Sequence, residues 1–395
     1  MILDTNQRLI YVPSIFYWSK AMLGMGVSAV MNGRKTKKKK TSFDLMKSGT
    51  AVFRLLPTNL AHKCAIQALK LGLVPKLAEI EDPILETDVW GMKFVNPLGM
   101  SAGFDKNAEV INGVSDLGFG FAEIGTVTPF PQQGNPKPNL FRLLEDGALI
   151  NRLGFPSKGA EKFARNLEKI RDISSFKIGI NIGINTGTSD PAGDINYCLN
   201  KLAGYASYIA INVSCPNTPG LCAWQAGDKL AELVEKAKLT LSKQVNERTP
   251  PLLVKIGQEL GDDQLAVVSK VALNYGIDGL VACNTTVKRP ATLRSNHAKE
   301  AGGLSGSPIK KQANQTLSKL FNMTNGKVVL IGCGGISSAK DAYERIKSGA
   351  SLLQLYTALI YGGPNIIAEI KKGLAAHLKE DGYANLSDAV GVNHI

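Results

Sequence analysis

Eight short runs of apolar residues, spread between Phe94 and Tyr356, dominate the hydrophobic pattern of this chain. Each run is nearly continuous in Val, Ile, Leu and Ala, which is typical of strands buried on both faces of a parallel sheet. The sequence therefore predicts strands at Phe94–Met100, Phe121–Gly125, Ile178–Ile182, Tyr208–Val213, Leu252–Ile256, Gly279–Cys283, Val328–Ile331 and Leu352–Tyr356.

Stretches with helical spacing of apolar residues separate these runs, for example Ala231–Ser242 and Gln264–Tyr275. Eight strand–helix units over about 280 residues match an α/β fold, the (β/α)8 TIM barrel, whose functional groups lie at the carboxyl ends of its strands. A doubly wound open sheet is the alternative, but no glycine-rich dinucleotide fingerprint follows the first run. We therefore expect the barrel.

Composition narrows the classes of function. The 395-residue chain is 44% hydrophobic and 20% charged, with a mean hydropathy of -0.01, an ordinary balance for a protein with one large core. None of its six cysteines forms a CxxC pair and its four histidines are scattered. Neither a metal site nor a disulfide framework is expected from that pattern.

Much of the net charge of +13 lies at the start of the chain. Residues 1–40 hold eight basic residues and one acid, which places +7 of the +13 there. The remaining 355 residues carry about +6 with mixed signs. We therefore do not expect the barrel to bind nucleic acid.

The N-terminal segment has the composition of a membrane-associating sequence. An apolar and aromatic stretch from Ile10 to Gly33, interrupted by Lys20, precedes the basic run RKTKKKK. Its 24 residues are long enough to cross a bilayer, although Pro13 and Lys20 weaken insertion, and the basic run favours anionic lipid surfaces. We assign residues 1–41 to a targeting or membrane-associating segment, with a cleaved or disordered targeting segment as the alternative to a membrane anchor.

Residues 42–80 form a second expected unit, which precedes a barrel domain at 81–395. The stretch Ser42–Lys76 predicts two short amphipathic helices broken near Pro57. Beside a membrane-associating segment, such a pair would open an apolar path for a lipid-soluble molecule. In a cytosolic protein, the same pair would cap the bottom of the barrel. The apolar face of the second helix would carry Ala65, Ile66, Leu69, Leu71 and Leu73.

Uncharged polar residues recur near the ends of the predicted strands. Asn151, Asn212, Asn217 and Asn284 lie at or just after such ends, with Thr285 beside the last. Asparagine offers a donor and an acceptor without charge, which suits a small ring of alternating C=O and N–H groups. One asparagine in such a place usually forms an Asx turn, but four at corresponding positions indicate a binding rim.

Two lysines and two glycine-rich runs complete the expected rim. Lys106 in SAGFDKN can neutralise a carboxylate. Lys255 ends its strand and would point into the barrel mouth, either as a Schiff-base lysine or beside a cofactor ring. The runs Gly302–Gly306 and Gly332–Ile336 supply backbone N–H groups for a phosphate.

Cys215 is the candidate base. It lies in NVSCPNTPG, a loop too polar for ordinary core, and a thiol with its usual pKa of about 8.5 can accept a proton near neutral pH. The alternative is a buried, inert thiol. We expect that inert character of Cys64, Cys198 and Cys333.

Long motifs carry a resemblance to one family. They are NPLGMSAGFDKNAE, GFGFAEIGTVTP, PQQGNPKP, INRLGF, NVSCPNTPGL, GIDGLVACNTT, GGLSGSP, IGCGGI and GASLLQLYTALIYGGP. From about Phe43 to its end, the chain resembles the membrane-bound, quinone-dependent (class 2) dihydroorotate dehydrogenases. The resemblance implies a barrel with FMN that oxidises (S)-dihydroorotate to orotate in de novo pyrimidine (UMP) biosynthesis and passes the electrons to a ubiquinone-type quinone.

The resemblance also implies roles for residues at matching positions. The implied FMN contacts are Ala102, Gly103, Phe104, Asp105, Lys106, Thr126, Asn181, Asn212, Lys255, Cys283, Gly306, Gly335, Tyr356 and Thr357. The implied orotate site consists of Lys106, Asn151, Arg152, Leu153, Gly154, Phe155, Asn212, Asn217, Asn284 and Thr285. The positions lining the approach of the quinone are His62, Arg142 and Tyr356.

The implied mechanism removes the C5 proton of the substrate ring through Cys215 and transfers the C6 hydride to the flavin N5. Class 2 members usually have serine at the position of Cys215, and cysteine is usual in the soluble class 1 enzymes. The chain also departs from the family at Asn139 and Cys222, where arginine is usual, at Ile184, where lysine is usual, and at Pro156, where asparagine is usual.

Three alternatives stay open at this point. The chain could be a degenerate paralogue that binds FMN with weak or no turnover, a class 1-like enzyme that reduces a soluble acceptor such as fumarate, or a lysine-dependent aldolase. The N-terminal extension argues against the class 1-like enzyme. We expect a monomer associated with membrane lipid, with the mitochondrial inner membrane favoured over a bacterial cytoplasmic membrane.

Overall fold

The computed structural model describes residues 50, 53–74, 76–77, 81–170, 176–215, 217, 221–225, 227–243 and 249–394. The stretch from Ile10 to Gly33, the basic run after it and most of the first predicted amphipathic helix lie outside these residues. No helix within the described part of the chain is both long and apolar enough to cross a membrane.

Eight parallel strands close into a barrel in the order β10-β12-β13-β3-β4-β7-β8-β9. The barrel strands are β3 (Leu98–Met100), β4 (Phe121–Val127), β7 (Lys177–Ile182), β8 (Tyr208–Asn212), β9 (Leu252–Ile256), β10 (Gly279–Ala282), β12 (Val329–Cys333) and β13 (Leu352–Leu355). The sequence-based prediction of a (β/α)8 barrel is confirmed, and each of the eight predicted runs overlaps one barrel strand.

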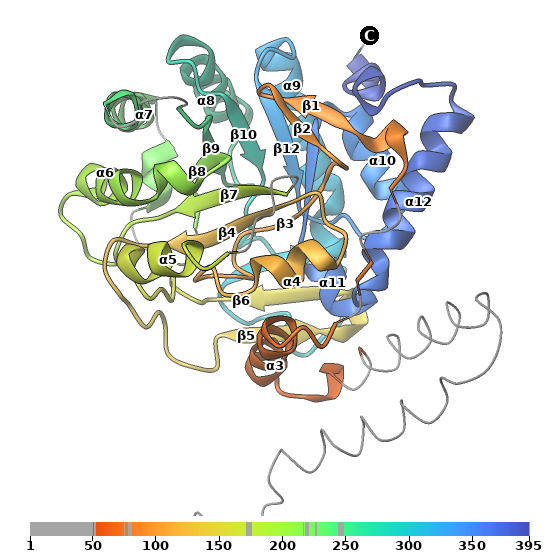
Figure 1. Ribbon diagram of the computed structural model, residues 1–395, viewed down its shortest axis with the longest axis horizontal. Helices are drawn as coiled ribbons and strands as arrows, with labels where there is room; N and C mark the ends of the chain where they lie inside the picture. Colours follow the sequence, from red (N-terminus) through yellow and green to blue (C-terminus); the bar gives the residue numbers. More distant parts are fainter. Residues whose placement is uncertain are drawn as a thin grey trace, which may run out of the picture. The chain divides into compact units, whose positions relative to one another are not determined.

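Helices alternate with the barrel strands and lie outside them (Figure 1). They are α4 (Ile111–Asp116), α5 (Ala160–Leu167), α6 (Pro191–Leu202), α7 (Gly227–Ser242), α8 (Asp262–Asn274), α9 (Lys310–Thr324), α10 (Ala339–Lys347), α11 (Thr357–Gly362) and α12 (Asn365–Glu380). One further helix, α3 (Thr58–Lys70), precedes the first strand.

The end of the barrel at the amino ends of its strands is filled by aromatic rings. A hairpin of β1 (Thr87–Val89) and β2 (Met92–Phe94) packs Phe94 against the buried Phe121, at 5.6 Å between ring centroids. Glycine makes room for these rings, since a Cβ at Gly99 would lie 2.3 Å from Phe121 and one at Gly179 would lie 2.1 Å from Tyr208. The barrel is therefore closed at this end, and space for a ligand is left at the carboxyl ends of the strands.

A three-stranded antiparallel sheet lies at the other end. It has the order β11-β6-β5 and consists of β5 (Leu140–Leu143), β6 (Ala148–Asn151) and β11 (Gly303–Gly306). In Figure 1, β5 lies beside α3. This sheet was not predicted, and it changes the expected local structure of two segments, while Asn151 and Gly306 both still line the cavity. Asn151 ends β6 rather than a barrel strand, and Gly303–Gly306 forms a strand paired with β6 rather than an open phosphate loop.

The first predicted strand is also divided in two. Phe94 ends β2, and β3 begins only at Leu98, because Asn96 and Pro97 interrupt the run. The Asn96 side chain accepts the Leu98 backbone N–H at 3.1 Å, and Pro97 has no N–H to donate to a ladder. The polypeptide turns here from the hairpin into the barrel.

Helix α3 covers less apolar surface than its sequence suggests. It begins after Pro57 and buries Ala61 and Leu69. It ends at Lys70, so that Leu71 and Leu73, placed on its apolar face by the sequence pattern, lie beyond it and are 68% and 65% exposed. Large apolar side chains are therefore left in solvent beside this helix.

Candidate active site

A cavity of about 420 Å³ lies at the carboxyl ends of the barrel strands, and the antiparallel sheet and α11 form part of its wall. Its size is within the usual range for small-molecule and cofactor sites. The rim residues predicted from sequence that line it are Ala102, Gly103, Lys106, Thr126, Asn151, Leu153, Gly154, Phe155, Asn212, Cys215, Asn217, Lys255, Cys283, Asn284, Thr285, Gly306, Gly335, Tyr356 and Thr357.

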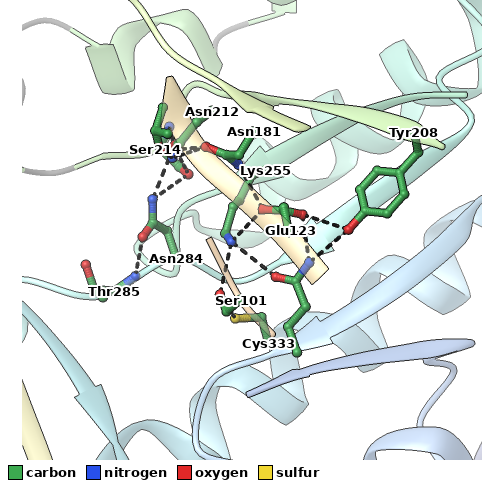
Figure 2. A network of polar contacts seen from close by, with 12 residues as sticks. Ser101, Glu123, Asn181, Tyr208, Asn212, Ser214, Lys255, Asn284, Thr285 and Cys333 are labelled. Atoms are coloured by element: carbon green, nitrogen blue, oxygen red, sulfur yellow. Dashed lines mark hydrogen bonds and ion pairs between the residues drawn. The ribbon is translucent and has the colours of Figure 1, made fainter. Parts of the chain in front are cut away.

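A buried cation lies at the floor of this cavity. The Lys255 ammonium contacts the Glu123 carboxylate at 3.1 Å and the Gln354 side-chain oxygen at 3.2 Å (Figure 2). Glu123 also accepts hydrogen bonds from the Gln354 amide at 2.7 Å and the Tyr208 hydroxyl at 3.2 Å. Burial opposes the charge on Lys255, but the Glu123 carboxylate outweighs it and raises the pKa of the lysine. The floor therefore carries a fixed ammonium group.

A chain of hydrogen bonds connects this floor to the rim. The Asn181 amide donates to Glu123 at 2.8 Å, and the Thr126 hydroxyl donates to the Asn181 oxygen at 2.6 Å. The Asn212 amide donates to both Thr126 and Asn181 at 3.3 Å. The Asn284 amide in turn donates to the Asn212 oxygen at 3.3 Å and to the Ser214 hydroxyl at 3.1 Å. Figure 2 shows this arrangement, which fixes the amides that sequence analysis placed at the rim.

Cys215 follows Ser214 in the loop after β8. The residue is 7% exposed and lines the cavity, as a base acting on a bound substrate must. Asn217, two residues on, donates its side-chain N–H to the Asn151 backbone oxygen at 3.1 Å, and so ties this loop to β6. Asn217 and Asn151, which both belong to the predicted substrate site, are therefore held together at one wall of the cavity.

Lys106 contributes the second cation. Its ammonium donates to the Gly103 backbone oxygen at 2.5 Å, and burial lowers the pKa of Lys106 to about 8. The preceding residue, Asp105, supports the loop, since its carboxylate accepts backbone N–H groups from residues 107, 109 and 110 at 3.2, 2.9 and 2.8 Å. Asp105 does not line the cavity, so its predicted cofactor contact stays a prediction.

Three aromatic rings connect α3 to the cavity wall. The His62 ring lies 5.5 Å from the Phe104 ring, which lies 6.1 Å from the ring of Tyr356. Burial, with a smaller contribution from the Lys106 charge, lowers the pKa of His62 to about 3, and burial raises that of Tyr356 to about 12. Both side chains are therefore neutral at pH 7.

Two predicted arginines have their side chains engaged outside the cavity. Arg152 forms an ion pair with Glu300 at 2.8 Å and stacks on the Phe141 ring at 4.5 Å. Arg142 donates to the Arg54 backbone oxygen at 2.5 Å, and burial lowers its pKa. Within the described part of the chain, Arg152, Arg142, His62, Phe104, Asp105 and Asn181 are the predicted site residues that do not line the cavity itself.

The positions that depart from the family pattern have distinct surroundings. Ile184 is buried in the apolar core, where a lysine would require a partner. Asn139 accepts the Asn59 amide of α3 at 3.3 Å, and Pro156 lines the cavity. The side chain of Cys222 lies outside the described residues.

Sequence analysis missed several contributors. Glu123 and Gln354 lie inside apolar strands, and the only signal in the sequence was a polar residue in an otherwise hydrophobic run. Their contacts with Lys255 across the barrel appear only in the structure. Cys333 was expected to be inert core but lines the cavity, with its sulfur 3.6 Å from the Ser101 hydroxyl. Cys198 is fully buried on α6, as expected.

Comparison with known proteins places the chain in a family. The sequence model of the dihydroorotate dehydrogenase family matches residues 84–378. The chain is 48% identical over 334 residues to dihydroorotate dehydrogenase (quinone) of Rhodospirillum rubrum, covering 85% of this chain and 90% of that protein. It is 42% identical over 350 residues to the mitochondrial dihydroorotate dehydrogenase (quinone) of Mus musculus, covering 87% of this chain and 89% of that protein.

Solved structures agree with this placement. The crystal structure of DHODH from Eimeria tenella in complex with ferulenol superposes with a TM-score of 0.83 at 39% identity, covering 85% of this chain and 95% of that one. The ligand-free form from the same organism gives a TM-score of 0.82 at 39% identity, over 86% and 99% of the two chains. This chain therefore belongs to the dihydroorotate dehydrogenases, oxidoreductases that share its barrel, and within them to the quinone-dependent class 2.

Proposed function

We propose that the chain oxidises (S)-dihydroorotate to orotate in its cavity, with FMN as the hydride acceptor and a ubiquinone-type quinone as the final electron acceptor. The observation that carries the proposal is the convergence, in one cavity, of a thiol, a row of fixed amides and the Lys106 ammonium. Such groups suit a small cyclic anion with alternating C=O and N–H groups, and dihydroorotate is one.

The residues of the cavity fit FMN. Gly103 has no side chain, so the cavity wall is flat at this position. A Cβ placed there would have one neighbour within 4 Å, the Tyr356 ring at 3.9 Å. Fixed uncharged donors and the Lys255 ammonium at the floor suit the polar edge of a flavin ring. The hydroxyls of Ser305 and Thr357, 2.9 Å apart, and the glycines 306, 334 and 335 offer small uncharged donors for a phosphate.

Bound FMN supplies a hydride acceptor, and the residues of the chain supply the rest. Lys106 and the amides of Asn212, Asn217 and Asn284 hold the substrate carboxylate and ring. Cys215 removes the C5 proton through its sulfur, while the fixed donors stabilise negative charge as it develops on the ring. Asn212 and Cys215 are buried in the cavity wall, and this low exposure to water strengthens their interactions.

The side of the barrel next to α3 fits the approach of an apolar acceptor. The neutral rings of His62, Phe104 and Tyr356 lead from the helix to the cavity wall. Exposed apolar residues flank the same helix, among them Leu60 at 46% and Leu71 at 68%. We therefore propose that residues 42–80 form the quinone access and meet the membrane, with residues 1–41 as a further membrane or targeting segment on a monomeric enzyme. The mitochondrial inner membrane is the favoured location, and a bacterial cytoplasmic membrane is the alternative.

An anaerobic two-step experiment tests this function. Addition of dihydroorotate to the purified, yellow protein is expected to bleach the flavin absorbance, and addition of a soluble ubiquinone analogue is expected to restore it. Restoration by fumarate but not by the quinone would instead identify a class 1-like enzyme. A flavin that is bound but never bleached would identify a paralogue without turnover, and a colourless protein that takes up no FMN would exclude the proposal.

A further inference from the structure

Arg345 lies behind the glycine turn that follows β12, and none of its hydrogen bonds leads to an anion. The side chain, on α10, is 1% exposed. Its guanidinium donates to the Gly334 backbone oxygen at 2.9 Å and to the Cys333 backbone oxygen at 3.3 Å. It also donates to the Asn314 side-chain oxygen at 3.0 Å and to the Lys310 backbone oxygen at 3.4 Å. All four acceptors are neutral oxygens.

The glycines of the GCGG run are required by this arginine and by the tight turn. A Cβ at Gly332 would lie 2.5 Å from the Arg345 Cγ, so glycine there lets the arginine stem pass. Gly334 and Gly335 have φ angles of +100° and +75°, which side chains rarely adopt. A Cβ at Gly335 would also lie 2.4 Å from the Lys310 Cα. The run is therefore built around a buried guanidinium.

The positive charge of Arg345 has no matching carboxylate among the described residues. Asp341, the carboxylate that acts electrostatically on Arg345, is paired with Lys310 at 2.9 Å. Burial lowers the pKa of Arg345, but a guanidinium stays protonated in proteins. A buried charge that is hydrogen-bonded but not compensated is costly, and an anion nearby would offset that cost.

The direction of the backbone indicates where this anion binds. The peptide bonds joining Cys333 to Gly334 and Gly334 to Gly335 are trans, so each N–H points away from its own C=O. Since Arg345 holds both carbonyls, the N–H groups of Gly334 and Gly335 point away from the guanidinium, and both glycines line the cavity. Hydrogen bonds to the carbonyls also polarise these peptides and strengthen their N–H groups as donors.

We propose that Arg345 is a positioning residue for the phosphate of the flavin: from behind the GCGG turn, it aims two backbone N–H groups at the phosphate and supplies the compensating positive charge. This inference rests on the proposed function, because it requires FMN as the cofactor. It explains how a wall made of glycines and hydroxyls can hold a dianion without a charged side chain in direct contact.

Flavin binding to the full-length chain tests the proposal. After removal of bound flavin, dissociation constants for FMN and for riboflavin, which lacks the phosphate, are measured by quenching of flavin fluorescence. In R345Q the constant for FMN is expected to rise at least about tenfold, as for loss of a charge-assisted interaction, with that for riboflavin nearly unchanged. The control K340Q makes the same charge change at an exposed position of α10 and is expected to alter neither constant.

Equal losses for FMN and riboflavin in R345Q would show a merely structural arginine and overturn the inference, as would an unchanged FMN constant. If R345Q does not fold, phosphorus NMR of the wild-type holoenzyme decides. A phosphate beside a buried cation is expected to stay dianionic well below its ordinary second pKa of about 6, and titration at that ordinary value would contradict the inference. A wild-type chain that binds no flavin would instead remove the proposed function itself.

Discussion

Burial determines which side chains in and next to the cavity can exchange a proton near pH 7. It raises the pKa of Cys283 and of Tyr356 to about 12, which keeps both neutral and unsuited to act as bases. It lowers the pKa of His62 to about 3, so that this residue stays unprotonated. Cys215 is thus the candidate base that remains at the predicted position, and Lys106 is the group whose charge changes just above neutral pH.

Replacement of Cys215 tests its role in proton removal. Cys215→Ala is expected to slow flavin reduction by dihydroorotate about 100-fold or more, because a general base is lost, while FMN stays bound. Stopped-flow single-turnover absorbance measures that step directly. Cys215→Ser is expected to keep part of the rate with a pH profile moved to higher pH, since a hydroxyl loses its proton less readily. Cys64→Ala on α3 serves as control, and a normal rate in Cys215→Ala would exclude the residue from the mechanism.

The pKa of Lys106 predicts how substrate binding depends on pH. The group is positively charged below its pKa of about 8 and neutral above it, so the affinity for the anionic product orotate is expected to be constant in the acidic direction and to fall as pH rises. The dissociation constant should increase about tenfold per pH unit above that value. Titration calorimetry across this range, in buffers of different ionisation heat, measures both the affinity and the proton taken up.

The matched variant for this test is Lys106→Met, which removes the charge and keeps the length of the side chain. It is expected to bind orotate weakly, with a dissociation constant that does not change over the same pH range. A wild-type affinity that stays level up to pH 10 would show that the Lys106 charge does not hold the carboxylate.

At the scale of elements, the barrel strands and helices such as α7 and α8 were predictable from the hydrophobic pattern, whereas the antiparallel sheet was not. Buried strands have continuous apolar runs in the sequence, and the eight runs therefore located the eight barrel strands. The split at Pro97 required the Asn96 turn to be recognised. Strand β11 escaped because it reads as a glycine loop and pairs with β6, far away in sequence, so only the tertiary fold defines it. Likewise, the contact between Glu123 and Lys255 joins residues 132 positions apart.

The docking of α3 on α4 makes a separate prediction. A Cβ at Gly113 would lie 2.9 Å from the Leu69 backbone oxygen, so Gly113→Ala is expected to push α3 outward at an overpacking cost of about 1–3 kcal/mol. If α3 forms the quinone access, the KM for a ubiquinone analogue should rise severalfold while flavin reduction by dihydroorotate stays normal. Steady-state kinetics measure the KM for the quinone analogue, and stopped-flow kinetics measure flavin reduction. Gly204→Ala, where a Cβ meets nothing within 4 Å, is the control. Equal slowing of flavin reduction and of its reoxidation by the quinone would contradict a role of α3 in quinone access alone.

At the scale of the whole molecule, the chemistry and the charge belong to different parts of the chain. The barrel holds the cavity and carries about +6 over 355 residues, whereas the first 40 residues carry +7. The family matches residues 84–378, which contain the whole cavity lining. The barrel is therefore expected to perform the chemistry alone, and the N-terminal residues are expected to set where it takes place.

Removal of residues 1–41 tests that division. The shortened chain is expected to reduce its flavin with dihydroorotate and reoxidise it with a soluble quinone analogue at nearly normal rates, because no residue of the cavity is removed. Its binding to vesicles containing anionic phospholipid, measured by co-sedimentation, should be strongly reduced.

In the full chain, replacement of Lys37, Lys38, Lys39 and Lys40 by glutamine should weaken that binding by about 100-fold or more, since each lysine near an anionic surface contributes about 1 kcal/mol. Added salt should weaken the binding of the full chain and have little effect on the glutamine variant, because only charge attraction is screened. If the shortened chain bound vesicles as tightly as the full chain, membrane attachment would have to be assigned to α3 and the exposed apolar residues around it.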